Sequence, residues 1–353
     1  MRRWINNIKI SLFLGFILSL LLSSCGNNNA SQTADGKKRL VFRYGHAQTA
    51  DDPRSKSMDF FKKELESKTN GRIKVELGYS NIYGSEQEMM DLVKTGGLQG
   101  TRGGSFQDAN IKYNIVTLPY LTRNWDQAIC LVRSDWINQV AIEAKKNGFY
   151  IPACGVAIGF RAHAYKKENL NNFKDVKGLK IRAPGAQEIY QKIIKSVGAN
   201  PVGVAWAETY SALKTGVVDG VSAIPAGIWD SKLYEALKTV VIDKHSITAD
   251  PLYVNLNWYQ SLPDDLKAVF DEVSVQTMRL SDELFRAYEK EVYDLLEKKL
   301  DLYVLNDKEM EEMVQLTSTI SDFFTERGDF TKEDIDQARK AASGCDNLST
   351  QKE

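Results

Sequence analysis

The sequence has few of the residues that ordinarily build metal centres and nucleophilic active sites. Three histidines occur in 353 residues, namely His46, His163 and His245. None of them stands in the His-Glu-x-x-His spacing of zinc hydrolases. The chain also has no Gly-x-Ser-x-Gly segment, so the strand-to-helix turn that carries the nucleophile of α/β-hydrolases is missing. These absences argue against an enzyme, and the sequence indicates no metal and no cofactor.

Cysteine is scarce, and neither sign of charge is in excess. The 46 basic residues balance the 46 acidic ones, which gives no electrostatic basis for nucleic-acid binding. Besides Cys25, which lies at the end of the N-terminal apolar segment, the cysteines are Cys130, Cys154 and Cys345. An odd number argues against a full disulfide framework. Either Cys130 pairs with Cys154 or both are buried free thiols, because free cysteine packs as a small hydrophobe.

The N-terminus has the pattern of an export signal. Arg2 and Arg3 precede an apolar run over residues 10–22, which is shorter than the roughly 20 residues that span a bilayer. The run ends in Leu-Ser-Ser-Cys-Gly, which resembles a bacterial lipoprotein lipobox. We therefore expect a lipoprotein signal over residues 1–24, acyl chains on Cys25, and a flexible tether over residues 25–38. The alternative is an ordinary signal with a chance cysteine nearby.

Strand and helix patterns alternate through the body of the chain. Four segments near its start predict a strand at 39–44, a helix at 55–68, a strand at 72–77 and a helix at 85–94. The last of these begins with a capping box of Ser85 and Glu88. The pattern recurs with strands at 178–182 and 200–204 and helices at 188–197 and 208–215. This order predicts two α/β lobes with largely parallel sheets, followed by one or two long helices over 264–300.

Four stretches together resemble the solute receptors of tripartite ATP-independent periplasmic (TRAP) transporters. They are Tyr-Gly-His-Ala at 44–47 with Asp-Pro at 52–53, Gly-Ser-Glu at 84–86 with Thr-Leu-Pro-Tyr-Leu at 117–121, the run 173–184, and the segments between 198 and 220. The strongest is the run 173–184, Phe-Lys-Asp-Val-Lys-Gly-Leu-Lys-Ile-Arg-Ala-Pro. The resemblance covers roughly residues 40–339, and it depends on the order and spacing of all four stretches.

The resemblance implies a periplasmic-binding-protein-like fold of type II, with two α/β lobes joined by crossing strands and a long C-terminal helix. We expect one lobe over 39–158 and about 248–285, the other over 159–247 and about 286–345, and a tail over 346–353. Such a receptor closes around a small organic acid and delivers it to a permease in the membrane. Some members of the family also work with a helical-repeat partner lipoprotein.

The resemblance also suggests which residues hold the ligand. Arg182 matches the arginine that grips the ligand carboxylate, and a guanidinium suits this task because its donors match a carboxylate bidentately. Arg161 lies where many members have a second arginine, and Trp206 where they have an aromatic residue in the pocket. Tyr44, His46 and Gln48 lie in the first strand-to-helix turn, where α/β sheets present ligand-binding loops, and His46 is equally consistent with a structural hydrogen-bonding role.

Three further positions are less clearly assigned. Phe106 is a weaker candidate for the pocket, and Glu86 fits the capped start of a helix better than a ligand contact. At Ala223 the family commonly has an asparagine that helps to hold the ligand. Its loss suggests a monocarboxylate with an apolar body. A hydrophobic ligand without a carboxylate and a receptor for an ATP-driven importer are the alternatives.

Overall fold

The computed structural model describes residues 39–103, 106–156, 159–170, 172–185 and 187–344, although the side chain of Phe106 is not among the described groups. The export signal, Cys25 and the tether that we expect from the sequence lie outside these residues. The chain divides into a unit that ends at Leu40 and a compact unit that begins at Val41. The following description concerns the second unit.

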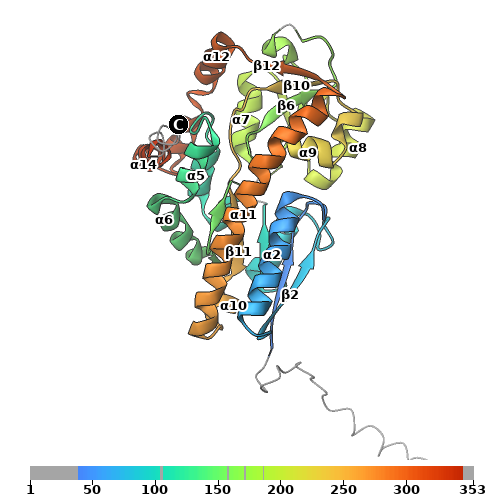
Figure 1. Ribbon diagram of the computed structural model, residues 1–353. Coiled ribbons are helices and arrows are strands. Elements are labelled where there is room, and N and C mark those ends of the chain that lie inside the picture. The colour runs from blue at the N-terminus through green and yellow to red at the C-terminus, as the bar shows by residue number, and fades with distance from the viewer. Residues whose placement is uncertain (1–38, 104–105, 157–158, 171, 186, 345–353) are drawn as a thin grey trace, which may run out of the picture. The chain divides into compact units, whose positions relative to one another are not determined.

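The first sheet is built mainly from the N-terminal part of this unit (Figure 1). Its strands run in the order β2-β1-β3-β11-β4, and β5 also pairs with β11. The strands are β1 (Leu40–Gly45), β2 (Ile73–Gly78), β3 (Gly100–Arg102), β4 (Phe149–Tyr150), β5 (Cys154–Gly155) and β11 (Asp250–Asn255). Helices α2 (Pro53–Lys68) and α3 (Glu86–Thr95) connect the first three strands. Ser85 and Glu88 form the predicted capping box of α3.

The second sheet comes from the middle of the chain and one later strand. Its order is β12-β10-β6-β9-β7-β8. The strands are β6 (Ala162–Tyr165), β7 (Lys180–Ala183), β8 (Asn200–Gly203), β9 (Gly220–Ala223), β10 (Thr239–Ile242) and β12 (Asp301–Val304). Helices α7 (Glu188–Ser196), α8 (Thr209–Thr215) and α9 (Pro225–Asp230) lie between them along the chain. The elements predicted in this region are therefore present.

Both sheets are mixed rather than largely parallel. Strand β11 is antiparallel to β3, β4 and β5, and strand β6 is antiparallel to β9 and β10. Each of these two strands follows a segment in which the chain crosses from the other sheet. A strand that enters this way does not follow a helical crossover within its own sheet, so the rule that makes βαβ units parallel does not apply to it. The sequence offered no sign of this difference.

Besides the long connection from β11 to β12, two shorter crossing segments connect the sheets, one between β5 and β6 and the other between β10 and β11. They meet in an antiparallel bridge between Phe160 and Ile247. Each contains a residue in the left-handed region, Gly159 with a φ of +72° and Lys244 with a φ of +44°. The backbone therefore turns sharply in both segments where the chain passes from sheet to sheet.

A single helix of 34 residues, α11 (Asp264–Glu297), accounts for the region where the sequence allowed one or two helices. It packs against α2 beside the first sheet and against α9 beside the second (Figure 1). Its buried stripe includes Leu266, Phe270 and Phe285, as expected for an amphipathic helix that covers a core.

Shorter helices complete the unit. They are α4 (Phe106–Ala109), α5 (Trp125–Val132), α6 (Asp135–Glu143), α10 (Leu256–Gln260), α12 (Asp307–Thr317), α13 (Ile320–Arg327) and α14 (Lys332–Ser343). Helix α14 packs against α5 and α6. Cys130, in α5, is disulfide-bonded, whereas Cys154 is a free thiol. These two cysteines therefore do not pair with each other.

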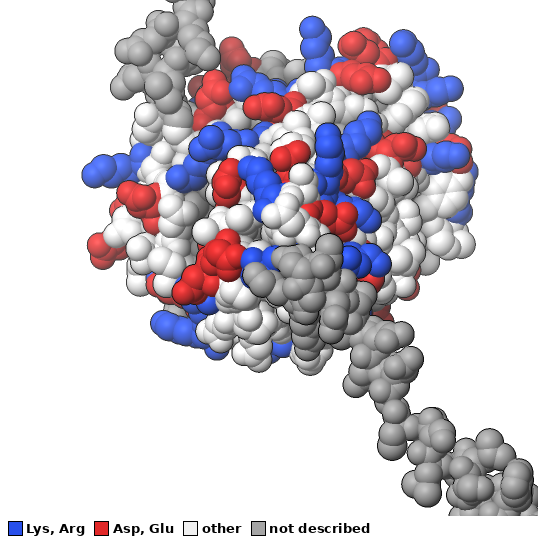
Figure 2. All heavy atoms as spheres, turned by 60° about the horizontal axis from the view of Figure 1, so that its bottom comes forward, with Lys and Arg blue, Asp and Glu red and all other residues white. Residues whose placement is uncertain are grey.

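Basic and acidic side chains are interspersed on the face of the molecule that Figure 2 shows. Among the described residues, no helix has both the length and the apolar character needed to cross a membrane.

Candidate ligand-binding cleft

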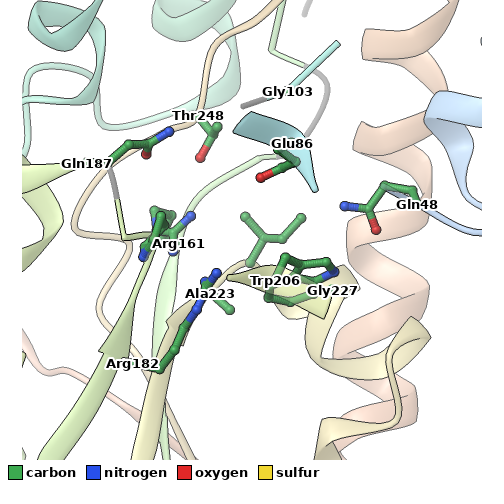
Figure 3. A pocket seen from close by; sticks show the side chains of 12 residues that line it. Gln48, Glu86, Gly103, Arg161, Arg182, Gln187, Trp206, Ala223, Gly227 and Thr248 are labelled. Atoms are coloured by element: carbon green, nitrogen blue, oxygen red, sulfur yellow. The ribbon is translucent and has the colours of Figure 1, made fainter. Parts of the chain in front are cut away.

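A cavity with a free volume of about 550 Å³, partly open to solvent, lies between elements of the two sheets. Its lining residues come from both crossing segments and both lobes (Figure 3): Gln48, Glu86, Gly103, Arg161, Arg182, Pro184, Gln187, Trp206, Ala223, Ile224, Gly227 and Thr248. A neighbouring cavity of about 620 Å³ shares five of them, including Glu86, Arg182 and Trp206. The two cavities therefore form one cleft.

Arg182 enters the cleft from strand β7 and is only 3% exposed. Its Nε donates a hydrogen bond to the carbonyl oxygen of Val204 at 2.9 Å. Burial, and then the positive charge of Arg161, lowers the pKa of Arg182 to about 9, although the carboxylate of Glu86 acts in the opposite direction. A lowered pKa means that the buried positive charge is poorly compensated in the protein alone. An anion bound at this place would stabilise it.

Arg161 enters the same cleft from the residue before β6 and is 7% exposed. Its guanidinium lies 4.1 Å from the centre of the Tyr190 ring. Its Nε donates to Ser222 Oγ at 3.3 Å, and its Nη2 donates to the carbonyl oxygen of Ser222. Burial lowers the pKa of Arg161 as well. Two buried guanidiniums thus approach one space, an arrangement that favours an anionic ligand group.

Glu86 is the first residue of α3 and lines the cleft, so it is more than the helix-cap residue that the sequence suggested. Gly103 shows how crowded this part is. A Cβ atom at Gly103 would lie 2.8 Å from Glu86 Oε1 and 3.1 Å from Arg54 Nη1, and its backbone φ of +85° also favours glycine. Behind them, the buried Arg54 donates from Nε to Asp250 Oδ2 at 2.9 Å. A carboxylate therefore faces the cleft that the two arginines enter.

Apolar groups form another part of the wall. Trp206 is half-buried in a short 3₁₀ helix (Trp206–Glu208), and Ile224 and Ala223 follow at the end of β9. Gly227 allows the ring of Trp206 to approach α9, because a Cβ at Gly227 would lie 3.0 Å from two of its ring carbons. The cleft thus combines an arginine-rich part, an acidic part and an apolar wall.

Not every predicted contact lies in the cleft. Tyr44 and His46 are fully buried outside its lining, where Tyr44 Oη and His46 Nδ1 are 2.7 Å apart and His46 Nε2 lies 2.8 Å from Ser55 Oγ. They are not among the lining residues, because the alternation of β1 turns Tyr44 into the core and His46 hydrogen-bonds to it, which agrees with the structural role that the sequence left open for His46. The side chain of Phe106, like Cys25, lies outside the described part of the chain.

Several lining residues were missed or undervalued in the sequence. Gln48, which the sequence placed in the first strand-to-helix turn with Tyr44 and His46, is the residue of that turn that lines the cleft. Gln187 and Thr248 precede α7 and β11, and neither belongs to a recognisable motif. Thr248 lies in a crossing segment, which only the folded chain brings to the cleft.

The comparison with known proteins supplies the family. The family model for bacterial extracellular solute-binding proteins, family 7 (DctP), matches residues 44–327. The chain belongs to this family. The expected kinship with TRAP receptors is confirmed at this level, and the protein is an extracytoplasmic solute receptor of the DctP family, not an enzyme.

Individual relatives agree with this placement. An uncharacterised protein of Haemophilus influenzae is 25% identical over 306 residues, 86% of this chain and 92% of the relative. The structure of a TRAP periplasmic solute-binding protein from H. influenzae with bound L-gulonate has a TM-score of 0.82 at 24% identity, over 86% of this chain and 100% of that one. A sugar-acid-binding protein from Advenella mimigardefordensis, in complex with galactonate, has a TM-score of 0.81 at 19% identity, over 87% and 99% of the two chains. These structures confirm the two-lobed α/β fold.

Proposed function

We propose that this DctP-family receptor captures a hydroxylated monocarboxylate in the cleft and delivers it to a TRAP-type permease. The observation that carries the proposal is the charge of the cleft: among the described residues that line it, Arg161 and Arg182 are the basic groups and Glu86 is the one acidic group. Two positive groups and one negative group leave one net positive charge, which a monoanion neutralises. A dicarboxylate would place its second charge in the same small cleft as Glu86, where like charges repel.

The remaining lining indicates the body of the ligand. The carboxylate of Glu86 and the amides of Gln48 and Gln187 suit hydroxyl groups, because a carboxylate accepts hydrogen bonds and an amide both donates and accepts. Trp206 and Ile224 suit a face of C–H groups on the other side. Sugar acids combine one carboxylate, several hydroxyls and such a face. A sugar acid thus replaces the monocarboxylate with an apolar body that Ala223 suggested. The two arginines of the cleft also favour it over a ligand without a carboxylate.

In this proposal Arg182 and Arg161 bind the carboxylate and Glu86 binds hydroxyl groups of the ligand. The solved relatives with bound L-gulonate and galactonate support a sugar acid by analogy. Because the lining comes from both lobes, a bound ligand contacts both at once and so favours the arrangement in which they enclose it. The proposal also includes a lipid anchor at Cys25, which would hold the receptor at the membrane near its permease.

The test begins with native mass spectrometry of the purified protein, to identify any small molecule that remains bound. Calorimetric titration with L-gulonate, D-galactonate, D-glucuronate and succinate at pH 7 follows. We expect at least one sugar acid to bind about 100-fold more tightly than succinate, a difference of about 2.7 kcal/mol. Preferential binding of succinate, or co-purification of a large apolar compound, would contradict the proposal.

A further inference from the structure

A chain of buried polar groups runs from Arg161 away from the cleft. Arg161 Nε lies 3.3 Å from Ser222 Oγ, Ser222 Oγ lies 3.4 Å from His245 Nε2, and His245 Nδ1 lies 2.9 Å from Asp243 Oδ1. All four residues are less than 10% exposed. Buried polar groups of this kind rigidify their surroundings when every member is satisfied.

The direction of these hydrogen bonds follows from the groups at the two ends of the series, the guanidinium of Arg161 and the carboxylate of Asp243. A guanidinium only donates, and an ionised carboxylate only accepts. Ser222 Oγ accepts from Arg161, so its own hydrogen is available for His245 Nε2, while His245 donates from Nδ1 to Asp243. Burial lowers the pKa of His245 to about 4, although Asp243 opposes the shift. A neutral imidazole with its proton on Nδ1 is therefore the form that satisfies every member.

His163 provides an internal comparison. Its Nδ1 lies 2.5 Å from the other oxygen of Asp243, and its ring stacks on that of His245 with the centres 4.3 Å apart. It is as deeply buried as His245. Within the described part of the chain, however, its Nε2 has no hydrogen-bond partner. Both histidines therefore contact the carboxylate of Asp243, but only His245 is connected to Arg161, through the hydroxyl group of Ser222.

The chain of groups also joins Arg161 to the segments that cross between the sheets. Asp243 and His245 lie in the segment between β10 and β11, and Ser222 lies in β9. In addition, the backbone N–H of Arg161 donates to the carbonyl oxygen of Ser246 at 2.8 Å. The guanidinium of Arg161 thus donates hydrogen bonds to Ser222 and packs against the face of the Tyr190 ring. Its place in the cleft depends on groups that never reach the cavity.

We propose that Ser222, His245 and Asp243 are positioning residues that orient the guanidinium of Arg161 for the ligand carboxylate. This inference rests on the proposed function, because it takes Arg161 to contact that carboxylate. The atoms of His163, Asp243 and His245 lie within 4.8 Å of one another and would also suit a metal ion. The hydrogen-bonded chain explains their grouping without one, since both Nδ1 atoms face a carboxylate oxygen at hydrogen-bond distance.

The decisive experiment compares His245→Asn with His163→Asn. Asparagine keeps an N–H for Asp243 but has no atom in the place of Nε2, so only the first variant breaks the connection to Ser222. With L-gulonate as the probe, we expect His245→Asn to lower the affinity about tenfold and His163→Asn to change it less than about twofold. Ser222→Ala should weaken binding like His245→Asn, and Ser222→Thr, which keeps the hydroxyl, should restore it. Equal effects of the two histidine variants would overturn the proposal.

A second measurement needs no ligand. Nitrogen-15 NMR follows exchange of the Arg161 Nε hydrogen with solvent, assigned by its loss in Arg161→Lys. We expect slow exchange in the wild-type protein and in His163→Asn, and at least about tenfold faster exchange in His245→Asn and Ser222→Ala. The proposal that Ser222, His245 and Asp243 position Arg161 would be overturned if exchange were unchanged in the last two variants. It would also be overturned if elemental analysis found a stoichiometric metal ion. If L-gulonate does not bind the wild-type protein, the affinity comparison uses whichever of the other sugar acids does bind; if none binds, the proposed ligand class fails, and the exchange of the Arg161 Nε hydrogen alone decides whether Ser222, His245 and Asp243 position Arg161.

Discussion

The guanidinium of Arg182 lies 5.2 Å from the centre of the Trp206 ring, so the charge proposed to bind the ligand carboxylate rests against an aromatic group of the same cleft. Such a contact stabilises a cation by roughly 0.5–2 kcal/mol, less than the cost of removing a guanidinium from water. The lowered pKa of Arg182 reflects this imbalance. Binding strength and folding stability should therefore respond to Arg182 in opposite directions.

Replacing Arg182 with methionine should weaken sugar-acid binding at least about 100-fold and yet raise the melting temperature by a few degrees. Lysine should not restore affinity, because it cannot pair bidentately with a carboxylate. Calorimetry and thermal unfolding at pH 7 measure the two effects. Arg286→Met is the control, since Arg286 forms an exposed ion pair with Asp126; it should change neither by much. Undiminished affinity in Arg182→Met would show that Arg182 is not the carboxylate site.

Glu86→Gln should change which acids bind. Removing this negative charge should weaken binding of the preferred sugar acid about tenfold and strengthen binding of succinate by a similar factor, because the second carboxylate of succinate no longer meets a like charge. Glu88→Gln is a matched control on the same helix, where the exposed Glu88 belongs to the capping box and glutamine can replace it there. If both variants kept the wild-type order of affinities, Glu86 would not determine specificity.

Gly227→Ala should displace the ring of Trp206. The new methyl group would lie 3.0 Å from two ring carbons and 3.3 Å from a side-chain carbon of Ile224. We expect an altered tryptophan emission spectrum and affinity reduced about threefold to tenfold. The same substitution in a Trp206→Phe background should reduce the affinity by a smaller factor, because the smaller ring leaves room for the methyl group. Equal losses in both backgrounds would show that Gly227 acts independently of Trp206.

The contribution of His245 to folding stability should be lost as the pH decreases from about 6.5 to about 4, whereas Asp52 and Asp282, whose pKa values burial raises to about 6, act in the opposite direction over the same range. In the unfolded chain His245 takes up a proton near its ordinary pKa, whereas in the folded protein burial lowers this pKa to about 4. At His245 the unfolded state therefore binds more protons in this range, and the loss of its contribution amounts to about 3 kcal/mol when complete. Asp243, whose pKa the neighbouring histidines hold below its usual range despite burial, acts in the same direction at still lower pH.

Urea unfolding at pH 7 and pH 4.5 measures this loss. His245→Asn removes this titrating group, so on going from pH 7 to pH 4.5 the wild-type protein should lose more stability than the variant, even if the variant is less stable at pH 7. A slope as steep as that of the wild-type protein would show that other groups, and not His245, set the acid sensitivity.

Local sequence patterns predicted the secondary structure because they report on neighbours along the chain. The alternation in β2 and the capping box at Ser85 needed no tertiary information. Glu86 shows the limit of such patterns. A helix start favours an acidic residue whether or not the helix points at a ligand, so the residue type was compatible with both roles and the sequence suggested the simpler one.

The pairing of cysteines and the direction of strands show a second limit. Cys130 and Cys154 are 24 residues apart in the numbering, yet separation along the chain says nothing about whether two thiols meet, and only the fold shows Cys154 to be free. Strands β6 and β11 have sequences like those of the other strands, and only the fold shows that they run antiparallel to their neighbours.

By itself, the sequence determined the alternating helices and strands, which depend on residues close together in the chain, and the relationship to TRAP receptors, which depends on the order and spacing of short motifs. That relationship in turn suggested Arg182. Only the tertiary structure decided that Glu86 and Gln48 share a cleft with Arg182 while Tyr44 and His46 do not. It also brought Ser222 and His245 behind Arg161. The physical reason is that local periodicity specifies which face of an element is buried, whereas the partners across a cleft are set by how the two sheets pack and where the chain crosses between them.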